Sequence, residues 1–486
     1  MLTYSFADAG SDSLYEYLYK CIKNDILNGV LAVGERLPSK RTFAKNLNIS
    51  IITVENAYAQ LMAEGYIFSL PKKGYFVADI SADMQKVLPS KPDSERIGSS
   101  SSALEDHLGT NSSQAVSAAS QTPDYFADFV SNHISPGSFP FSTWAKIMRE
   151  IISEESHALM TNPPSGGILK LRQAISDYLY QFRGMSIDPE QIIIGAGTEY
   201  LYGLLIQLLG NDRIFAVEDP GYQKIAQIYT SHGADCRHIS MDTQGVSIEA
   251  LEKSGADIIH ISPSHHFPTG IVTPISRRYE LLGWAARSSS RYIIEDDYDC
   301  EFRLQGRPIP SLQSIDVMEK VIYINTFSKT LASTIRISYM ILPKHLLEQF
   351  YKRLGFYSCT VSNFEQYTLA RFISKGYFEK HINRTRNYYK TLRNTLLEHI
   401  KSSPLAPCTT IMEEDAGLHF LMKISTDLSD EELIDKAKKE GLRILCLSRY
   451  YHSPANHKEH IIVMNYSGIE LSKIPEAVAR LERCIL

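Results

Sequence analysis

No run of about 18 apolar residues occurs in the sequence, so we expect no membrane-spanning helix. No C-x-x-C pair occurs either: the seven cysteines are dispersed singly, which disfavours a disulfide framework or a zinc site and favours reduced cytoplasmic thiols. The first residues, MLTYSFADAGSD, lack the apolar core of a secretory signal, and we expect a cytoplasmic protein. With 50 basic and 55 acidic residues, the net charge of −5 excludes a uniformly basic nucleic-acid coat protein but not a local basic patch.

A change of composition divides the 486 residues into a small and a large module. Residues 81–123 are rich in Ser, Ala and Gln and contain almost no aromatic side chains. Such a segment buries too little apolar surface to offset the entropy cost of ordering, so we interpret it as a flexible linker. It separates residues 1–80 from residues 124–486, and the hydrophobic content of 44% is enough for a sizeable core.

The small module has the pattern of three helices followed by a hairpin. Apolar residues recur at spacings of three and four over Ser13–Leu27, which predicts an amphipathic helix. Pro38-Ser39 opens a short second helix that Asn48 ends, and Ser50 can cap a third. Two short apolar runs within residues 66–77 then flank a basic tip, as in a β-hairpin. This order predicts a winged helix-turn-helix, an α+β fold.

Positive charge is concentrated in the second half of this module, where DNA phosphates would be met. Two acidic residues stand there against six basic ones: Arg36, Lys40, Arg41, Lys45, Lys72 and Lys73. Thr53 and Asn56 are the expected base-edge contacts, because the start of the recognition helix enters the major groove. Charge alone leaves open a solvated surface on a small helical domain, but the order of elements disfavours it.

The segment LPSKRTFAKNLNISIITVENAYAQLMAEGYIFSLPKKGYFV resembles the N-terminal winged helix of GntR-type bacterial repressors. The resemblance covers nearly the whole small module and implies binding to operator DNA. In that family an Arg often follows the Ser of the turn, and here the residue is Ile51. A phosphate or base contact is lost there, which leaves more of the binding to Arg41 and the wing lysines.

Short apolar runs alternate with helical stretches in the large module, which predicts an α/β fold with a mostly parallel sheet. The expected strands are Gln191–Ile194, Arg213–Val217, Asp257–Ser262, Tyr292–Glu295 and Val321–Asn325. In such sheets, ligands bind at the carboxyl ends of the strands. Polar residues do follow these strands: Gly197, Thr198, Glu199, Tyr222, His265, Asp296, Tyr298, Thr326, Ser328, Lys329 and Arg336.

One ligand would use nearly all of these residues: pyridoxal 5′-phosphate, which needs an amine, an anion beside its ring nitrogen and a phosphate cradle. Lys329 can form the Schiff base, and Asp296 can keep the ring nitrogen protonated. Tyr298 can donate to the ring hydroxyl, and Tyr222 can stack on the ring. The expected phosphate contacts are Gly197, Thr198 and Glu199 at a helix N-terminus, with Thr326, Ser328 and Arg336.

Each motif alone has a plainer explanation. A Ser-Lys pair after a strand is usually a solvated turn, and Gly195-Ala196-Gly197 can be a simple strand-to-helix turn. The run Asp296–Asp299 is typical of a surface loop, and as a metal site it lacks matching ligands elsewhere. His265-His266 could suggest zinc, but adjacent side chains diverge on an extended chain. The combination, in this order and at strand ends, favours the cofactor.

The large module resembles the fold-type I aminotransferases over residues 125–486, and the whole chain resembles the MocR/GabR-type transcription regulators. The matching segments are EDPGYQKI, SPSHHFPTG, EDDYDCEFR and NTFSKTLASTIR. The resemblance implies that Lys329 is the Schiff-base lysine, with Asp296, Tyr298 and Arg336 in the roles given above. It also implies a head-to-tail homodimer in which each DNA-binding module reaches across to the partner's large domain.

Two departures from the family pattern bear on the ligand. In the γ-aminobutyrate-responsive member an Arg lies two residues after the stacking Tyr, where this chain has Lys224. The Arg that grips the substrate carboxylate in most aminotransferases belongs in the segment IVMNYS, residues 462–467, and Val463 stands at its position. An amino acid would thereby lose a contact worth about 1.5–3 kcal/mol. Arg449 is a possible substitute, and with Lys224 and His265 it is a candidate effector contact; Arg443 is expected to cap or flank a strand.

The leading hypothesis is a transcription regulator that depends on pyridoxal phosphate. Its effector is the cofactor itself or an amino compound that condenses with it, and the missing clamp favours the cofactor. A working aminotransferase with a fused DNA-binding module is the alternative, since the lysine and the electron-sink Asp are both present. A third hypothesis is a vestigial fold with an empty site.

Overall fold

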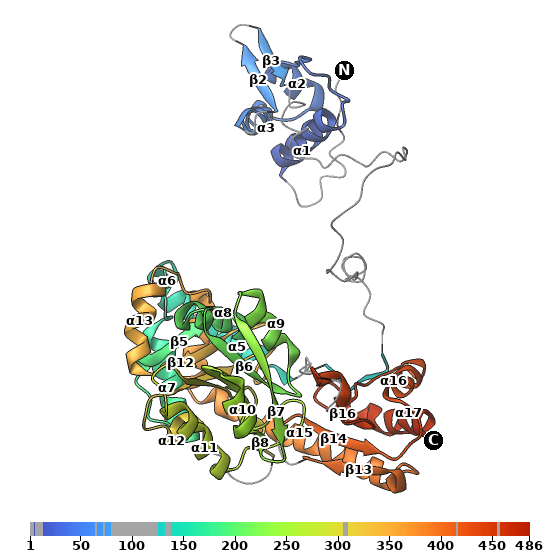
Figure 1. The fold of residues 1–486 in the computed structure, drawn as a ribbon. Helices are drawn as coiled ribbons and strands as arrows, with labels where there is room; N and C mark the ends of the chain where they lie inside the picture. The colour runs from blue at the N-terminus through green and yellow to red at the C-terminus, as the bar shows by residue number, and fades with distance from the viewer. Residues whose placement is uncertain are drawn as a thin grey trace, which may run out of the picture. The chain divides into compact units, whose positions relative to one another are not determined.

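The computed structural model describes Tyr4 and residues 13–63, 66–70, 73–78, 125–131, 138–304, 310–414, 417–453 and 457–486. The chain forms two compact units, Met1–Asn111 and Ser112–Leu486 (Figure 1). The expected linker, residues 81–123, lies outside the described residues, so its limits stay a prediction. Among the described residues, no helix combines the length and apolar character needed to cross a bilayer.

The small unit is a winged helix, as predicted. Its elements are α1 (Leu14–Leu27), β1 (Arg36–Leu37), α2 (Lys40–Leu47), α3 (Ile51–Ala63), β2 (Ile67–Leu70) and β3 (Gly74–Val77). The caps are those expected: Ser39 accepts the Thr42 N–H, Ser50 accepts the Thr53 N–H, and Asn48 ends α2 in the left-handed region. Strand β1 was not predicted; it is two residues long and pairs with β3, which gives the order β1-β3-β2.

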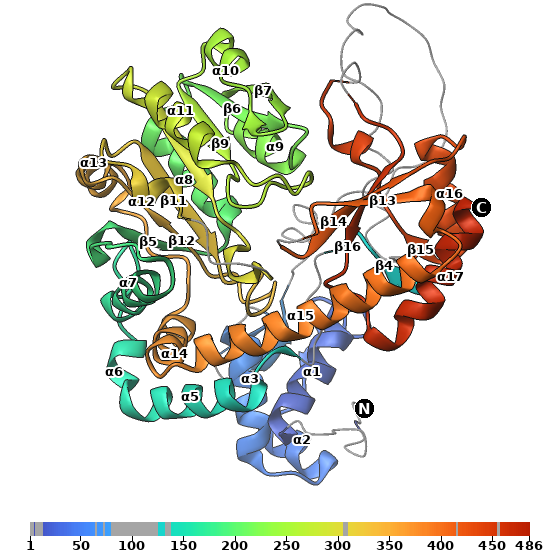
Figure 2. The same ribbon diagram turned by 90° about the horizontal axis from the view of Figure 1, so that it is seen from below.

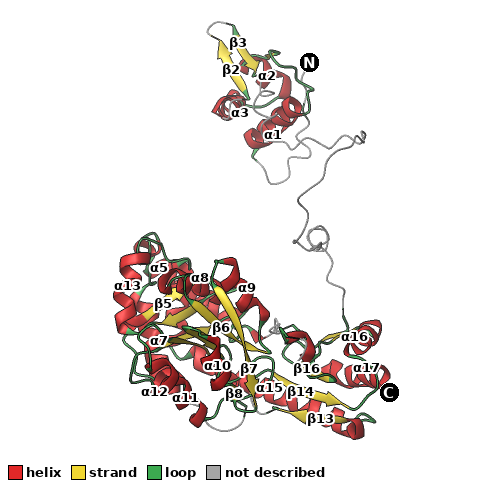
Figure 3. Cartoon of the chain, in the orientation of Figure 1, coloured by secondary structure: helices red, strands yellow, loops and turns green. Residues whose placement is uncertain are grey.

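The described part of the large unit contains an eight-stranded sheet in the order β5-β12-β11-β10-β9-β6-β7-β8. These strands are β5 (Ile192–Gly195), β6 (Ile214–Asp219), β7 (Asp235–Asp242), β8 (Gly245–Val246), β9 (Ile258–Ile261), β10 (Tyr292–Asp296), β11 (Val321–Thr326) and β12 (Ser338–Ile341). Strands are coloured yellow in Figure 3, among them β5, β6, β7 and β8 of this sheet. All five predicted strands are present, and the sheet is mostly parallel. Strand β12 is antiparallel to both β11 and β5, and β8 is antiparallel to β7.

Helices cover both faces of this sheet (Figure 2). One face packs against α8 (Thr198–Leu209), α9 (Gln223–Ser231) and α13 (Lys344–Leu354). The other packs against α5 (Phe141–Glu154), α7 (Leu169–Arg183), α10 (Ile248–Ser254), α11 (Ile275–Ala286), α12 (Leu312–Ile315) and α14 (Asn363–Ser374). Strands buried on both sides appear in the sequence as continuous apolar runs, which is why they could be predicted.

A smaller C-terminal subdomain completes the large unit. It consists of β13 (Thr409–Met412), β14 (His419–Ile424), β16 (Ile461–Asn465), α16 (Asp430–Lys439) and α17 (Ile474–Ile485). The helix α15 (Tyr377–Ser402) runs to it from beside α14 (Figure 2). Near the start of the unit, β4 (Ala127–Asp128) pairs in parallel with β15 (Leu442–Arg443) of this subdomain. Arg443 was expected to cap or flank a strand; it is instead the last residue of β15, and its side chain donates a hydrogen bond to Asp128 of β4.

Candidate functional site

The predicted site residues lie at one edge of the sheet because the strands that carry them end there. Asp296 is the last residue of β10, and Lys329 follows the end of β11. The chain then turns back as β12, with Ser338 opposite both Thr326 of β11 and Gly195 of β5. Helix α8 starts directly after β5. The antiparallel strand therefore brings Arg336, before β12, to the same edge as Lys329 and the start of α8.

Asp296 is buried, with its two oxygens in different environments. Tyr202 on α8 donates a hydrogen bond to Oδ2, and Nε2 of His260 on β9 lies 3.5 Å from the same atom. The other oxygen, Oδ1, is buried and has no hydrogen-bond partner among the described residues. A buried carboxylate oxygen without a donor is costly, so this atom suits a ligand that brings its own N–H. A protonated pyridine nitrogen fits that requirement.

Tyr202 and His260 were not singled out from the sequence. Tyr202 lies one turn into α8 after Thr198, and that spacing could have placed it near the site. His260 sits inside an apolar strand, where nothing distinguishes it from a core residue. Its Nδ1 is 2.6 Å from the hydroxyl of Tyr229, so a chain of hydrogen-bonding groups stands behind the carboxylate of Asp296.

Lys329 is largely enclosed, and burial lowers the pKa of its amine to about 8. Nearby Asp299 and Asp296 act in the opposite direction, since negative charge favours the ammonium form. A lysine with an ordinary pKa near 10.4 is almost fully protonated at neutral pH. With a pKa of about 8, Lys329 has a larger neutral fraction there than an ordinary lysine, and the neutral amine is the form that attacks a carbonyl carbon.

Three groups that could hold an anion meet at the start of α8, and we call this place the anion site. Gly197 precedes the helix with φ of 93°, and a Cβ built on it would lie 2.6 Å from a guanidinium nitrogen of Arg336. Only glycine leaves room for this approach. Ser328 has a buried hydroxyl without a partner among the described residues. The helix N-terminus, the guanidinium and this hydroxyl together fit a phosphate group.

Two of the expected phosphate contacts have other partners in the structure. The Thr326 hydroxyl accepts hydrogen bonds from Ser338 Oγ, at 2.7 Å, and from the Ser328 backbone N–H, so it orders the turn after β11. The Glu199 carboxylate forms an ion pair with Lys224 and lies 3.4 Å from Arg336. These cations, Lys224 first, lower the pKa of Glu199. A permanent negative charge therefore stands beside the anion site.

Tyr298 and His265 lie next to each other on the same side as Asp299. The Tyr298 hydroxyl donates to the backbone oxygen of His265 at 3.1 Å, so its expected partner, a ring hydroxyl, is not needed to satisfy it. Nδ1 of His265 is 2.8 Å from Asp299 Oδ2, and its ring lies 4.6 Å from that of His419. Burial holds the pKa of His419 well below the usual range, and the positive charge of Lys329 lowers it further.

The adjacent histidines do diverge. The ring of His266 turns to Thr269, with Nε2 3.3 Å from Glu218, away from the His265–Asp299 pair. Burial lowers the pKa of His266 to about 3 and raises that of Glu218 to about 8, so the two form a neutral contact rather than an ion pair. No cluster of three or more metal-binding side chains occurs among the described residues.

The remaining candidates are Tyr222, expected to stack on the cofactor ring, and the effector contacts Lys224 and Arg449. Tyr222 precedes α9 and is half-exposed, with its ring edge-on to Phe267. Lys224 is occupied by Glu199. The Arg449 side chain is bonded to Glu431 at 3.0 Å. Val463 is buried in an apolar cluster of the C-terminal subdomain with Leu421, Leu447 and Ile461, so the position of the usual carboxylate clamp is filled by apolar packing.

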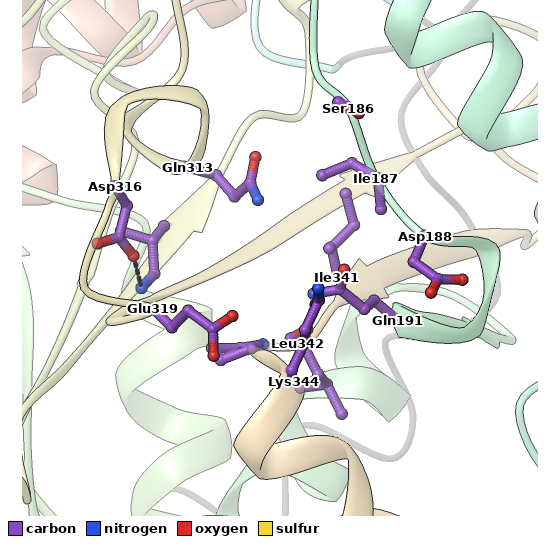
Figure 4. Close-up of a pocket in the computed structure, with 12 residues that line it drawn as sticks. Ser186, Ile187, Asp188, Gln191, Gln313, Asp316, Glu319, Ile341, Leu342 and Lys344 are labelled. Atoms are coloured by element: carbon purple, nitrogen blue, oxygen red, sulfur yellow. Dashed lines mark hydrogen bonds between the residues drawn. The ribbon is translucent and has the colours of Figure 1, made fainter.

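A cavity of about 440 Å³ lies at the opposite edge of the sheet, near the start of β11 (Figure 4). Two of its carboxylates already have structural partners. Asp316 accepts the backbone N–H groups of Met318, Lys320 and Val321, and Asp188 caps the turn before β5. Because ligands of open α/β sheets bind at the carboxyl ends of strands, this cavity is not the functional site.

The predicted DNA contacts differ in how free their side chains are. Arg36, Arg41, Asn56 and Lys73 are exposed, whereas Lys72 lies outside the described residues. Lys40 bonds Glu55 at 2.7 Å and lies over the ring of Tyr75. The Thr53 hydroxyl is within 2.8 Å of Ser50 Oγ and belongs to the helix cap. Asn56 is therefore the freer of the two expected base-edge residues.

The chain matches two family descriptions, "Bacterial regulatory proteins, gntR family" over residues 14–77 and "Aminotransferase class I and II" over residues 132–480. An uncharacterized HTH-type transcriptional regulator of Bacillus subtilis, YdeL, is 36% identical and covers 96% of both chains. The probable rhizopine catabolism regulatory protein MocR of Rhizobium meliloti is 31% identical and covers 97% of this chain and 94% of its own.

The chain belongs to the MocR-type family of HTH-type transcriptional regulators. A third relative, the pyridoxine biosynthesis regulator PdxR of Corynebacterium glutamicum, is 27% identical over 90% of this chain and 89% of its own. The large unit also has the fold of the kynurenine aminotransferase of Pyrococcus horikoshii, with a TM-score of 0.66 and 23% identity over 77% of this chain and 96% of that one. MocR-type membership thus agrees with the winged helix and the aminotransferase-like fold.

Proposed function

We propose that this MocR-type regulator binds pyridoxal 5′-phosphate through Lys329 and couples that binding to operator recognition in the cytoplasm. The observation that carries the proposal is the environment of Asp296. Its buried Oδ1 has no donor among the described residues, and Asp296 influences the pKa of Lys329. One small ring with a pyridine nitrogen and an aldehyde could place the protonated nitrogen at the Asp296 carboxylate and the aldehyde at the Lys329 amine.

The surrounding residues have distinct tasks in this proposal. When bound, the cofactor supplies an aldehyde and an electron-withdrawing ring. Asp296 would hold a proton at the ring nitrogen, and Tyr202 with His260 keeps its carboxylate oriented. Arg336 and Ser328 would hold the phosphate at the start of α8. Since these groups lie on different strands, binding would join several segments of the large unit.

The effector follows from the charges at the substrate side. Val463 fills the clamp position with an apolar side chain, Lys224 is paired with Glu199, and Arg449 is paired with Glu431. An amino acid would find no unpaired arginine at these positions. We therefore propose pyridoxal phosphate itself as the signal, in preference to a carboxylate-bearing amino compound. The similarity to PdxR, a pyridoxine biosynthesis transcriptional regulator, supports this choice.

A signal acts only if it binds one arrangement of the regulator more tightly than another. We propose a head-to-tail homodimer in which cofactor binding changes the spacing or orientation of two winged helices. Large apolar side chains exposed on the described surface of the large unit support self-association: Phe141, Met160, Leu169, Tyr180 and Phe356.

The test begins with the absorption spectrum of the purified full-length protein in saturating pyridoxal phosphate. Wild type should show a Schiff-base absorption band. After reduction of the imine with borohydride, mass spectrometry should find the cofactor attached to Lys329. Lys329→Ala should lose the band, and Lys344→Ala, an exposed lysine, should keep it. The cofactor is then titrated against DNA selected from a random pool. If it changes the affinity of wild type and Lys329→Ala equally, the sensing proposal is wrong.

A working aminotransferase is the second candidate, favoured by the lowered pKa of Lys329 and the intact Asp296. Efficient turnover would require a carboxylate site, and Val463 argues against one. The measurement is steady-state transamination of common amino acids by the full chain. A kcat in the usual enzyme range of about 1–10³ s⁻¹ would reverse the order of the two candidates.

A further inference from the structure

The first turn of α3 carries two exposed isoleucines that the core does not explain. The exposed fractions are 47% for Ile51 and 68% for Ile52, whereas Val54 and Ala57 on the same helix are fully buried. A β-branched side chain on the surface of a helix brings neither packing nor good helix propensity. The stability of the folded unit therefore does not explain Ile51 and Ile52, and a contact with another molecule would.

Ile52 lies in the middle of the face that α3 presents to solvent. Residues four and seven positions further on, Asn56 and Ala59, are also exposed and lie on the same stripe of the helix. Glu55 beside them is neutralised by Lys40 at 2.7 Å. Thr53 is turned toward the Ser50 cap. The start of the recognition helix thus presents an apolar surface followed by one free amide.

Exposed cations stand on elements of the same unit. Arg41 and Lys45 are exposed on α2, which packs against α3, and Lys73 is exposed beside the start of β3. Cations suit the edges of a DNA groove, which are phosphates. Ile51 and Ile52 stand at the start of α3, the part of a recognition helix that enters the major groove. In the major groove, the apolar group available to them is the C5-methyl of thymine.

We propose that Ile51 and Ile52 recognise thymine methyl groups in the operator, so that this regulator requires thymine at the base pairs under the start of α3. The proposal rests on the DNA-binding function and specifies its sequence preference. Ile51 then replaces the polar contact that the GntR pattern often has at this position with an apolar one. In this proposal Arg41 and the wing bind the DNA phosphates, and the two isoleucines distinguish thymine from other bases.

The test removes single methyl groups from DNA. Sites are selected from a random pool with the full-length protein, and each thymine is replaced in turn by deoxyuridine, which lacks only the C5-methyl. At one or two thymines in each half-site, the Kd of wild type should rise about three- to fivefold, as expected for one buried methyl. Other thymines should change the Kd less than twofold.

The variant Ile52→Ala should bind the parent site more weakly and should no longer distinguish thymine from deoxyuridine at the sensitive position. Ile275→Ala removes a comparably exposed isoleucine from the large unit and should keep the full distinction. If no deoxyuridine substitution weakens wild type, or if Ile52→Ala keeps the thymine preference, the proposal is wrong. If no sequence is enriched at all, specific DNA binding fails, and the proposal fails with it.

Discussion

Gly197 lies so close to Arg336 that a single added carbon would stand 2.6 Å from the guanidinium. The two residues are far apart in sequence and meet because β12 returns the chain beside β5. Both backbones are in the left-handed region, with φ of 93° and 49°. The contact fixes the guanidinium over the start of α8, where an anion is stabilised by the helix N-terminus.

Gly197→Ala should therefore weaken pyridoxal phosphate binding by at least tenfold, because the new methyl displaces Arg336 and the backbone is strained. The measurement is an absorbance titration of the full-length protein with cofactor. Gly233→Ala is the matched control: its φ is 81°, and the nearest atom to a new Cβ is 3.6 Å away. Equal losses in the two variants would mean that backbone strain, and not the displaced arginine, is responsible.

Glu199→Gln should have the opposite effect on the cofactor. The Glu199 carboxylate lies 3.4 Å from Arg336 and forms an ion pair with Lys224. It therefore competes with a bound phosphate for the positive charge of these two side chains. Because these side chains are partly exposed and screened by solvent, we expect a modest gain, a Kd for pyridoxal phosphate about three- to tenfold lower. Glu431→Gln, which alters the pair with Arg449, is the control and should leave this Kd unchanged. Weaker binding by Glu199→Gln would show that Glu199 helps to hold the ligand.

The rate of Schiff-base formation should rise with pH through a midpoint near 8, the pKa to which burial lowers the Lys329 amine. The neutral amine is the reactive form, so the rate grows as the proton leaves. Asp299 raises this pKa, and Asp299→Asn should therefore move the midpoint below that of wild type. Stopped-flow absorbance over a pH series gives both midpoints. A wild-type midpoint near that of a free lysine would contradict the buried environment.

Arg41 and Lys40 should differ in their contribution to DNA binding. Arg41 is exposed and has no ion pair among the described residues, whereas Lys40 is bonded to Glu55. If Arg41 meets a phosphate, Arg41→Ala should lower the slope of log K against log salt by about one. Lys40→Ala should change it less, since its charge is already balanced. Equal slopes for the two variants and wild type would exclude a phosphate contact by either side chain.

The sequence was most informative where a local rule decides the structure. Ser39 and Ser50 at helix starts and Asn48 at a helix end follow capping chemistry, and the buried parallel strands appear as apolar runs. Strand β12 was missed because its direction depends on its neighbours β5 and β11, which no local pattern encodes. Strand β1 is too short to show a period.

The same limit applies to the site. The strand ends predicted which segments meet, since parallel strands end at one edge. Side-chain partners depend on distances across the fold, and these were missed. Tyr202 and His260 share the carboxylate of Asp296, and Thr326 turns to Ser338. Nor could the sequence show that Arg449 is held by Glu431.

The pairing of β4 with β15 joins the first described strand of the large unit to its C-terminal subdomain. Phe126 and Phe129 donate backbone hydrogen bonds to Gly441 and Arg443, and Phe129 accepts one from Asn465 on β16. Strand β4 is thus hydrogen-bonded to the subdomain that carries His419 and Val463, and not to the eight-stranded sheet. Because β4 is the first described strand of the large unit, a rotation of this C-terminal subdomain relative to the eight-stranded sheet would also move β4.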